Sequence, residues 1–142
     1  MTIARLIEGR KAAVLTCNAD LPVRDAITLL AERRIGALPV MADGHVAGIF
    51  SERDVIYQLQ AKGPAVLDSP VGEVMTSPAV TVDPQTEVLA ALSLMTRRRI
   101  RHLPVVQEDE LIGFVSIGDL VKVRIDRIES EAEALRTYIQ TA

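Results

Sequence analysis

The chain has 142 residues and a formal net charge of −3, and 49% of its residues are hydrophobic although only 3% are aromatic. This length can bury a real aliphatic core, whereas the acidic balance excludes a general nucleic-acid binder and the scarcity of aromatic rings leaves little surface for stacking bases or sugars. Cys17 is the only cysteine, which excludes an intrachain disulfide, and without a signal peptide or an apolar run of 18 residues we expect a cytoplasmic protein with no membrane partner.

The first predicted element is a short helix within residues 2–10. Thr2 stands where a cap belongs, and Ile3, Leu6 and Ile7 form an apolar stripe. We therefore assign residues 1–12 to an N-terminal helical segment, and we expect it to pack on the rest of the chain or on a partner copy.

Residues 13–62 are expected to form the first of two similar units. It begins with a short apolar strand over residues 13–16, after which Asp20 is placed as the N-cap of a helix. That helix has one apolar face, because apolar residues recur at i, i+3, i+4 and i+7: Val23, Ala26, Ile27 and Leu30.

A β-hairpin and a second helix complete this unit. Two apolar segments flank Asp43-Gly44, a pair of residues typical of a tight hairpin turn. Ser51 then opens a helix, and stop signals end it at Gly63-Pro64. Residues 63–78 are expected to be a linker in which Ser69-Pro70 starts a short helical turn.

The second unit, residues 79–124, repeats the first. Moving the sequence by 65 residues without a gap superposes three landmarks: Leu38-Pro39-Val40 on Leu103-Pro104-Val105, Gly48 on Gly113, and Ser51-x-x-Asp54 on Ser116-x-x-Asp119. Each unit should therefore contain a strand, a helix, two strands and a helix, with the first strand of the second unit at 79–82 and an N-cap at Asp83.

The last helix of the second unit is predicted to continue into residues 125–142. It starts near Ile117 and keeps an apolar stripe almost to the terminus, formed by Ile125, Ile128, Ala132, Leu135 and Ile139. A helix of this length with one apolar face needs a surface to pack on. We expect that surface to be the N-terminal segment or a second protomer.

The order of elements, the duplication and the Gly-hydrophobic-hydrophobic-Ser-x-x-Asp signature at 48–54 and 113–119 resemble a tandem pair of cystathionine-β-synthase (CBS) domains. The likeness runs from about residue 16 to about residue 124. It implies an α+β fold, in which two tandem β-α-β-β-α repeats form a pseudo-two-fold sandwich flanked by N- and C-terminal helices. It also implies clefts between the repeats that bind adenosine-containing ligands, and dimerisation into a flat disk.

The chemistry is expected where the second strand of each hairpin meets a helix. The unpaired N–H groups at a helix N-terminus favour an anion, and there Ser51 is suited to a phosphate or ribose oxygen and Arg53 to a phosphate charge. The resemblance assigns the ribose hydroxyls to Asp54 and Asp119. Ser-x-x-Asp is also close to a capping box, which satisfies backbone donors and binds nothing. Both interpretations stay open, and the family pattern favours binding.

The second copy has no cation at this junction, because Gly118 stands where the first copy has Arg53. In nucleotide-sensing members of the family that it resembles, a basic pair just before the second strand reaches ligand phosphates, and Arg101-His102 occupies that place. The preceding run, 97–99, is expected only to favour the helix C-terminus through its dipole.

An adenine ring needs an apolar slot, and each copy offers candidates around its Leu-Pro-Val segment. We expect one cleft to be lined by Ile35, Ala37, Leu38, Pro39 and Val40, and the other by Ile100, His102, Leu103, Pro104 and Val105, with Thr16 and Thr81 contributing from the first strands and Ser116 from the second junction. Proline cannot donate to a strand ladder, which places Pro39 and Pro104 at an edge or a ligand-facing end. The clefts should be unequal, and a nicotinamide-adenine dinucleotide could use the charge of both.

Catalytic and metal-binding patterns are missing from the sequence. His45 and His102 have no second ligand at metal spacing, no nucleophile triad can be assembled, and no phosphate-binding P-loop is present. We therefore expect a non-catalytic homodimeric sensor of AMP, ADP, ATP or NAD(H) that acts on an unknown protein in trans. The alternatives are a constitutive interaction scaffold with empty clefts and, third, an enzyme.

Overall fold

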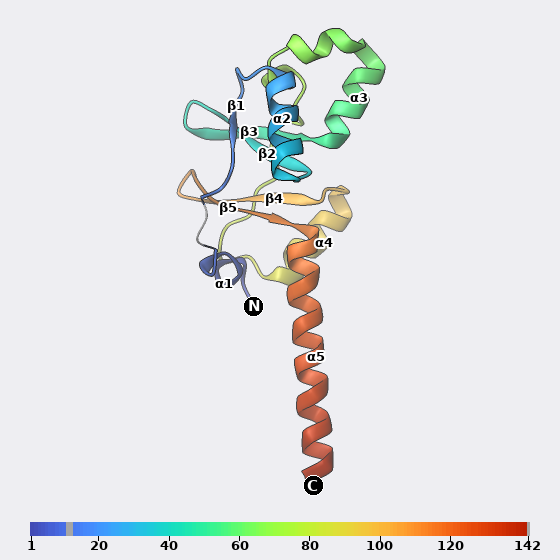
Figure 1. Cartoon of the computed structure of the whole chain (residues 1–142). Coiled ribbons are helices and arrows are strands. Elements are labelled where there is room, and N and C mark those ends of the chain that lie inside the picture. Colours follow the sequence, from blue (N-terminus) through green and yellow to red (C-terminus); the bar gives the residue numbers. More distant parts are fainter. Residues whose placement is uncertain (11–12, 142) are drawn as a thin grey trace.

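The computed structural model describes residues 1–10 and 13–141, so parts of the expected terminal segments, residues 11–12 and 142, lie outside the described residues. The elements are α1 (Ile3–Glu8), β1 (Cys17–Asn18), α2 (Val23–Arg33), β2 (Ala37–Ala42), β3 (His45–Ser51), α3 (Glu52–Lys62), the 3-10 helices η1 (Pro64–Asp68) and η2 (Val71–Glu73), α4 (Val88–Arg98), β4 (His102–Gln107), β5 (Glu110–Ser116) and α5 (Ile117–Thr141). Figure 1 shows the two hairpins one above the other, with the helices of each repeat on its outer side.

Both predicted hairpins are present, and their turns explain why they form. Asp43 and Gly44 both have positive φ, at 53° and 79°, as do Glu108 and Asp109, at 51° and 64°. Two consecutive left-handed residues match the right-handed twist of the flanking strands. The register that follows pairs Ala37 with Ser51 and His102 with Ser116, so the start of each hairpin lies beside the helix that leaves it.

Each repeat has its own aliphatic core. Helices α2 and α4 bury the predicted faces, with Val23, Ala26 and Leu30 in the first core and Val88, Ala91 and Met95 in the second. β3 and β5 bring the two hairpins into contact. The molecule is thus the expected α+β arrangement of two tandem repeats.

The predicted N-caps are wrong. Pro22 and Glu87 occupy the N-cap positions of α2 and α4, and neither makes a side-chain cap. Asp83 instead accepts a hydrogen bond from the backbone N–H of Gln85 at 2.7 Å, and the N–H of Asp20 donates to the Asn18 side chain. Short polar side chains at these positions stabilise turns just before the helices rather than the helix ends themselves.

The predicted first strands are also wrong. Residues 13–16 form no strand, and β1 pairs with β2 in parallel only through Cys17 and Asn18 before the chain turns. In the second repeat the strand expected at 79–82 is reduced to one parallel bridge between Val82 and Val105. The turns that follow at Asn18 and Asp83 leave room for only one or two ladder residues.

The N-terminal helix belongs to the second repeat. Ile3 is fully buried in the second core, and the N–H groups of Ile3 and Ala4 donate to the carbonyls of Thr86 and Pro84 at 2.9 and 2.8 Å. Thr2 precedes the helix but makes no side-chain cap. The sequence allowed this segment to pack on its own chain or on a partner copy. In the structure it packs on its own chain.

The C-terminal helix α5 has 25 residues, as the unbroken stripe predicted. Leu120 is its only fully buried residue, and every residue from 125 to 141 is exposed. Figure 1 shows the helix running away from both repeats and from α1. The N-terminal segment therefore does not cover it, and the expected surface for its apolar stripe is not supplied by the described part of the chain.

Candidate functional site

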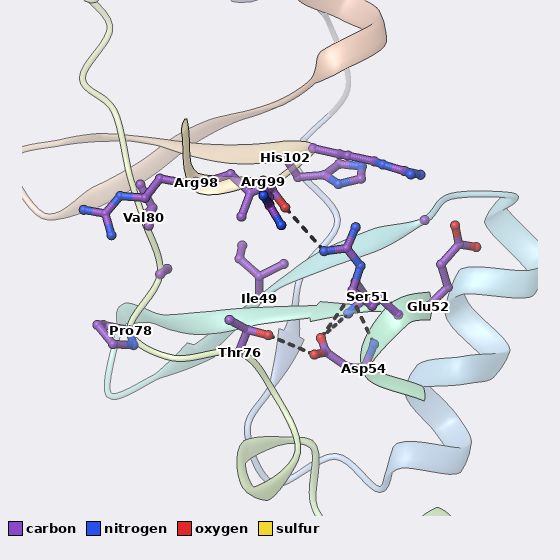
Figure 2. Close-up of a pocket in the computed structure, with 15 residues that line it drawn as sticks. Ile49, Ser51, Glu52, Asp54, Thr76, Pro78, Val80, Arg98, Arg99 and His102 are labelled. Atoms are coloured by element: carbon purple, nitrogen blue, oxygen red, sulfur yellow. Dashed lines mark hydrogen bonds between the residues drawn. The ribbon is translucent and has the colours of Figure 1, made fainter. Parts of the chain in front are cut away.

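The first strand-to-helix junction, between β3 and α3, forms a complete capping box. The N–H of Ser51 donates to Asp54 Oδ2 at 2.8 Å, and the N–H of Asp54 donates to Ser51 Oγ at 3.4 Å. Thr76 from the linker adds a bond from its hydroxyl to Asp54 Oδ1 at 2.8 Å (Figure 2). A carboxylate has about four acceptor sites, so Asp54 is oriented by these donors and can still accept others.

The second junction, between β5 and α5, repeats the backbone part of this geometry. The N–H of Ser116 donates to Asp119 Oδ2 at 2.8 Å, and the N–H of Asp119 donates to Ser116 Oγ at 3.2 Å. The cation missing at Gly118 is supplied from the N-terminal segment. Arg10 forms an ion pair with Asp119 at 2.8 Å and donates to the Phe114 carbonyl at 2.7 Å.

Arg10 also sets the electrostatics of this junction. Burial works to raise the pKa of Asp119, but the hydrogen bonds from Ser116 and Arg10, together with the Arg10 charge, outweigh it and hold that pKa below its usual value. Asp119 is therefore already paired with a cation, whereas the donors to Asp54 within the described residues are all neutral.

The signature glycine of each repeat makes room for a neighbouring segment. A Cβ on Gly48 would lie 2.6 Å from the Thr76 carbonyl oxygen and 2.7 Å from Met75 Sδ. The corresponding atom on Gly113 would lie 3.1 Å from Ile7 Cγ2. These close approaches bring Thr76 to the first junction and the N-terminal segment to the second.

The first cleft lies between the repeats and has a volume of about 360 Å³. The first junction, the linker and the segment between α4 and β4 line it: Gly36, Ile49, Ser51, Glu52, Arg53, Asp54, Thr76, Pro78, Ala79, Val80, Arg98, Arg99, Ile100, Arg101 and His102. Four arginines against two carboxylates make this cleft suited to an anion. Figure 2 shows Ile49 between the Thr76–Asp54 pair and Arg99, where it gives the cleft an apolar wall.

The second cleft, of about 640 Å³, has a different character. It is lined by the N-terminal segment, the start of the first hairpin and the second junction: Ile7, Arg10, Ala13, Val14, Leu15, Ile35, Gly36, Ala37, His102, Ile112, Gly113, Phe114, Ser116 and Asp119. Among the described residues that line it, the one arginine and the one carboxylate pair with each other. The described linings of the two clefts are thus unequal, as expected, and the first has four arginines against two carboxylates.

His102 lies at the wall between the clefts and lines both, as does Gly36. Its ring stacks on Phe114, with centroids 5.3 Å apart and planes 13° apart. Burial is the main cause that lowers the pKa of His102, with Arg101 acting in the same direction, while Asp119 and Glu52 oppose them. The imidazole is accordingly held toward its neutral form.

The repeats exchange their contributions to the clefts. Ile100, Arg101 and His102 of the second repeat join Ser51, Arg53 and Asp54 in the first cleft, and Ile35 and Ala37 of the first repeat join Ser116 and Asp119 in the second. Arg101 thus lines only the cleft at the junction of the other repeat, whereas His102 lines both clefts.

Eight predicted lining residues do not line either cleft. Leu38, Pro39, Val40, Leu103 and Pro104 are buried, because both faces of each hairpin are covered, and Val105 shares their position in the core. Thr16 lines a shallow groove near the hairpin turns, and Thr81 is exposed on the surface.

Sequence reasoning also missed residues that line the clefts. Arg98 and Arg99, interpreted there as charges at a helix end, line the first cleft, and the Arg99 carbonyl accepts a hydrogen bond from Arg53. Thr76 and Arg10 lie outside the duplicated units, so the repeat could not point to them. A threonine two residues before Pro78 and a lone arginine just after the first helix were the only signals.

Other kinds of site find no support in the described part of the chain. Among residues 1–10 and 13–141, no three His, Cys, Asp or Glu side chains gather in a way that could hold a metal ion. Within the same residues, no helix combines the length and the apolar character needed to cross a membrane.

A family model for the CBS domain matches residues 11–61 and 71–126. The chain is 39% identical over 131 residues to the protein CBSX3, a mitochondrial CBS domain-containing protein of Arabidopsis thaliana; the alignment covers 89% of this chain but 64% of the plant protein. A CBS-domain containing protein of Agrobacterium tumefaciens superposes with a TM-score of 0.81 at 35% identity, covering 87% of this chain and 92% of that one. The structure of CBSX2 in complex with AMP superposes with a TM-score of 0.74 at 26% identity, covering 88% and 96%.

Proposed function

The chain belongs to the CBS-domain family as a tandem CBS pair, and from that premise we propose that it is a sensor of adenosine-containing nucleotides that regulates another protein in trans. Proteins made of CBS domains alone are regulatory modules rather than enzymes, so the clefts are to be understood as binding sites. The chain spans only part of the length of its plant relative CBSX3, and the activities of such longer proteins are not transferred to it.

The observation that carries the proposal is the composition of the first cleft. Ser51 and Asp54 stand at one side, held by the capping box and by Thr76. Arg53, Arg98, Arg99 and Arg101 surround the same space. A ribose needs acceptors for its paired hydroxyls and a phosphate needs cations, so this arrangement fits a phosphorylated nucleoside.

A pose follows from these positions. The ribose hydroxyls donate to Asp54, whose Oδ1 accepts only one bond, from Thr76. The phosphate lies toward Arg53 and the α4–β4 arginines, and the adenine packs on Ile49 and Val80. The complex between CBSX2 and AMP supports an adenosine nucleotide as the ligand. AMP, ADP and ATP fit this description, and a dinucleotide such as NAD(H) would extend past His102 into the second cleft.

The signal would arise from differential affinity. A ligand held by Asp54 of the first repeat and by Arg99 and Arg101 of the second binds best when the repeats are close, and it shifts the population toward that arrangement. Arg53 already joins the repeats through the Arg99 carbonyl at 3.3 Å. A phosphate that recruits Arg53 would compete for this bond, which makes the contact sensitive to occupancy.

Two observations favour the second candidate function, a constitutive interaction scaffold. The capping boxes give the carboxylates of Asp54 and Asp119 a structural role within the chain, and α3 exposes Ile56 and Tyr57 by 63% and 64%. Such residues suit a protein partner, and in either function we propose that the module works as a homodimer.

A thermal-shift screen against AMP, ADP, ATP, NAD⁺, NADH, S-adenosylmethionine and adenosine separates the two functions. A ligand that binds only the folded state adds roughly 2.7 kcal/mol at about 100 times its Kd, which raises the Tm of a chain of this size by several degrees. We expect a selective shift with phosphorylated adenosines that is lost in Asp54→Asn and kept in the surface control Asp109→Asn. If none of the seven compounds shifts the Tm, the scaffold becomes the better account.

A further inference from the structure

The exposed length of α5 carries a heptad pattern. Its apolar residues alternate steps of four and three: Val121, Ile125, Ile128, Ala132, Leu135 and Ile139. Five of them are large, and their side chains are between 40% and 65% exposed. A strict alternation of four and three is the a and d pattern of a coiled coil, in which each apolar residue packs against a second helix.

The described part of the chain leaves this seam uncovered. Helix α5 packs on α4 and β5 near its start, where Leu120 and Val123 join the second core. Figure 1 shows its C-terminal length projecting alone. Most of the stability of a helix in water comes from packing its apolar face, so a projecting helix with this face requires a partner.

The charges beside the seam identify the partner as a second copy of the same helix. Arg124 and Glu131 occupy g positions, and Glu129 and Arg136 occupy e positions. In a parallel, in-register pair each g residue faces the e residue five positions further along the other helix. Arg124 then faces Glu129 of the partner subunit and Glu131 faces Arg136 of the partner subunit, so every pair has opposite charges and two-fold symmetry forms each pair twice.

These charged side chains have only weak partners in the single chain. Glu131 pairs with Arg127 at 3.1 Å, and Arg136 pairs with Glu133 at 3.6 Å, along the exposed surface of the helix. Exposed pairs of this kind contribute little, so they can exchange for contacts across a seam. Leu135 at d with Ile139 at a favours a two-stranded assembly, whereas Ile125 at a with Ile128 at d is the pattern of higher oligomers, so the charge pairing carries the choice of two strands.

We propose that α5 pairs with α5 of a second copy in a parallel, in-register, two-stranded coiled coil running from Val121 to Ile139. An antiparallel pair would set the two bodies at opposite ends of a rod, whereas the parallel pair sets them at the same end, beside each other. The proposal concerns the seam and its orientation, and it holds whether or not the clefts bind nucleotides.

Sedimentation equilibrium over a range of concentrations tests the seam. Ile128→Asp and Leu135→Asp place a charge at d positions, and Ser130→Asp places the same residue on the opposite face of the same helix. We expect dimer dissociation constants raised at least tenfold for the two seam variants and unchanged for Ser130→Asp. A monomeric wild type, or seam variants that dimerise as tightly as the control, would overturn the proposal.

Cysteine cross-linking tests the orientation. Cys17 is buried and burial raises the pKa of its thiol to about 11, so the wild type supplies an unreactive background. Val121→Cys and Leu135→Cys should each form disulfide-linked dimers with themselves under oxidation, and Ser130→Cys should not. Cross-links that appear only when Val121→Cys is mixed with Ile139→Cys would show an antiparallel pair and refute the proposed arrangement.

These experiments stay separate from the question of ligand binding. The substituted side chains are exposed and lie away from both clefts. A thermal shift with a nucleotide should therefore persist in Ile128→Asp. Loss of dimerisation is seen by sedimentation equilibrium, whereas loss of the nucleotide site is seen by thermal shift.

Discussion

The guanidinium of Arg53 donates a hydrogen bond to the backbone carbonyl of Arg99 at 3.3 Å, across the boundary between the two repeats. Arg53 leaves the first turn of α3, and Arg99 caps the end of α4 in a left-handed conformation with φ of 55°. This contact joins the two elements that surround the first cleft. A ligand phosphate placed between them would draw on the same guanidinium.

Replacement of Arg53 should separate phosphate affinity from nucleoside affinity. Arg53→Ala removes a charge-assisted hydrogen bond of about 1.5–3 kcal/mol, so we expect AMP to bind at least tenfold more weakly while adenosine changes little. Isothermal titration calorimetry measures both, and Arg127→Ala on the exposed surface of α5 is the matched control. Equal losses for AMP and adenosine would contradict the phosphate role.

Asp54 has a structural and a binding role that two variants can separate. Asp54→Ala removes the acceptor of the capping box and should cost about 1 kcal/mol of unfolding free energy, measured by urea denaturation. Asp54→Asn keeps an oxygen acceptor, so its stability should fall less. Both variants should lose the affinity for ribose-containing ligands; an Asp54→Asn variant that binds AMP normally would leave Asp54 as a helix cap only.

The Arg10–Asp119 pair predicts a pH dependence of stability. Because the pKa of Asp119 is lowered in the folded state from a reference of 3.8, its contribution is fully present above that reference and is lost as pH falls through the lower, folded value. Arg10→Ala raises the folded pKa toward the reference. We expect the variant and the wild type to differ in unfolding free energy at neutral pH and to converge in acid.

Urea denaturation between about pH 2 and pH 7 follows this convergence. Arg5→Ala, on the same N-terminal helix, is the control, because Arg5 is exposed and forms no ion pair with residues 1–10 or 13–141. A difference between Arg10→Ala and wild type that stays constant across this range would mean that Arg10 stabilises the protein by packing rather than through Asp119.

The two signature glycines should respond differently to a methyl group. In Gly48→Ala the new Cβ meets the backbone carbonyl of Thr76 at 2.6 Å, and overpacking of this kind costs about 1–3 kcal/mol. In Gly113→Ala it meets the end of the Ile7 side chain at 3.1 Å, which can move. We expect a lower Tm for Gly48→Ala than for Gly113→Ala, and the reverse order would contradict the close approach at Thr76.

Much of the fold could be predicted because the signals are local. Two left-handed residues make each hairpin turn, and the 3.6-residue period marks the buried faces of α2 and α4. The predicted bounds of the first strands were wrong because a short apolar run does not reveal where strand pairing stops. Turns at Asn18 and Asp83 end the pairing early. The predicted N-caps were wrong because a polar residue just before a helix can also stabilise a turn.

The residues of the candidate site also fall into two groups, those that a pattern along the chain predicts and those that it does not. The junction residues Ser51, Asp54, Ser116 and Asp119 were found because they recur at a fixed distance in the sequence. Arg10 and Thr76 lie outside the duplicated units and have no equivalent in the other copy. They reach the junctions only through tertiary contacts, so no pattern along the chain indicates them. The buried positions of Leu38 and Leu103 likewise depend on which face of a hairpin is covered, which the sequence period alone does not decide.

The exchange of Ile35 and Ala37 for Ile100 and His102 between the clefts has a consequence for the origin of the protein. A single ancestral unit could complete a cleft only by meeting its twin, and the meeting would produce two identical clefts. In one polypeptide the two copies can differ in sequence, so a substitution in one copy changes one cleft without the same change in the other. Arg53 in the first copy and Gly118 at the equivalent position of the second are one such difference, and a single chain thereby carries two unlike clefts in a repeated frame.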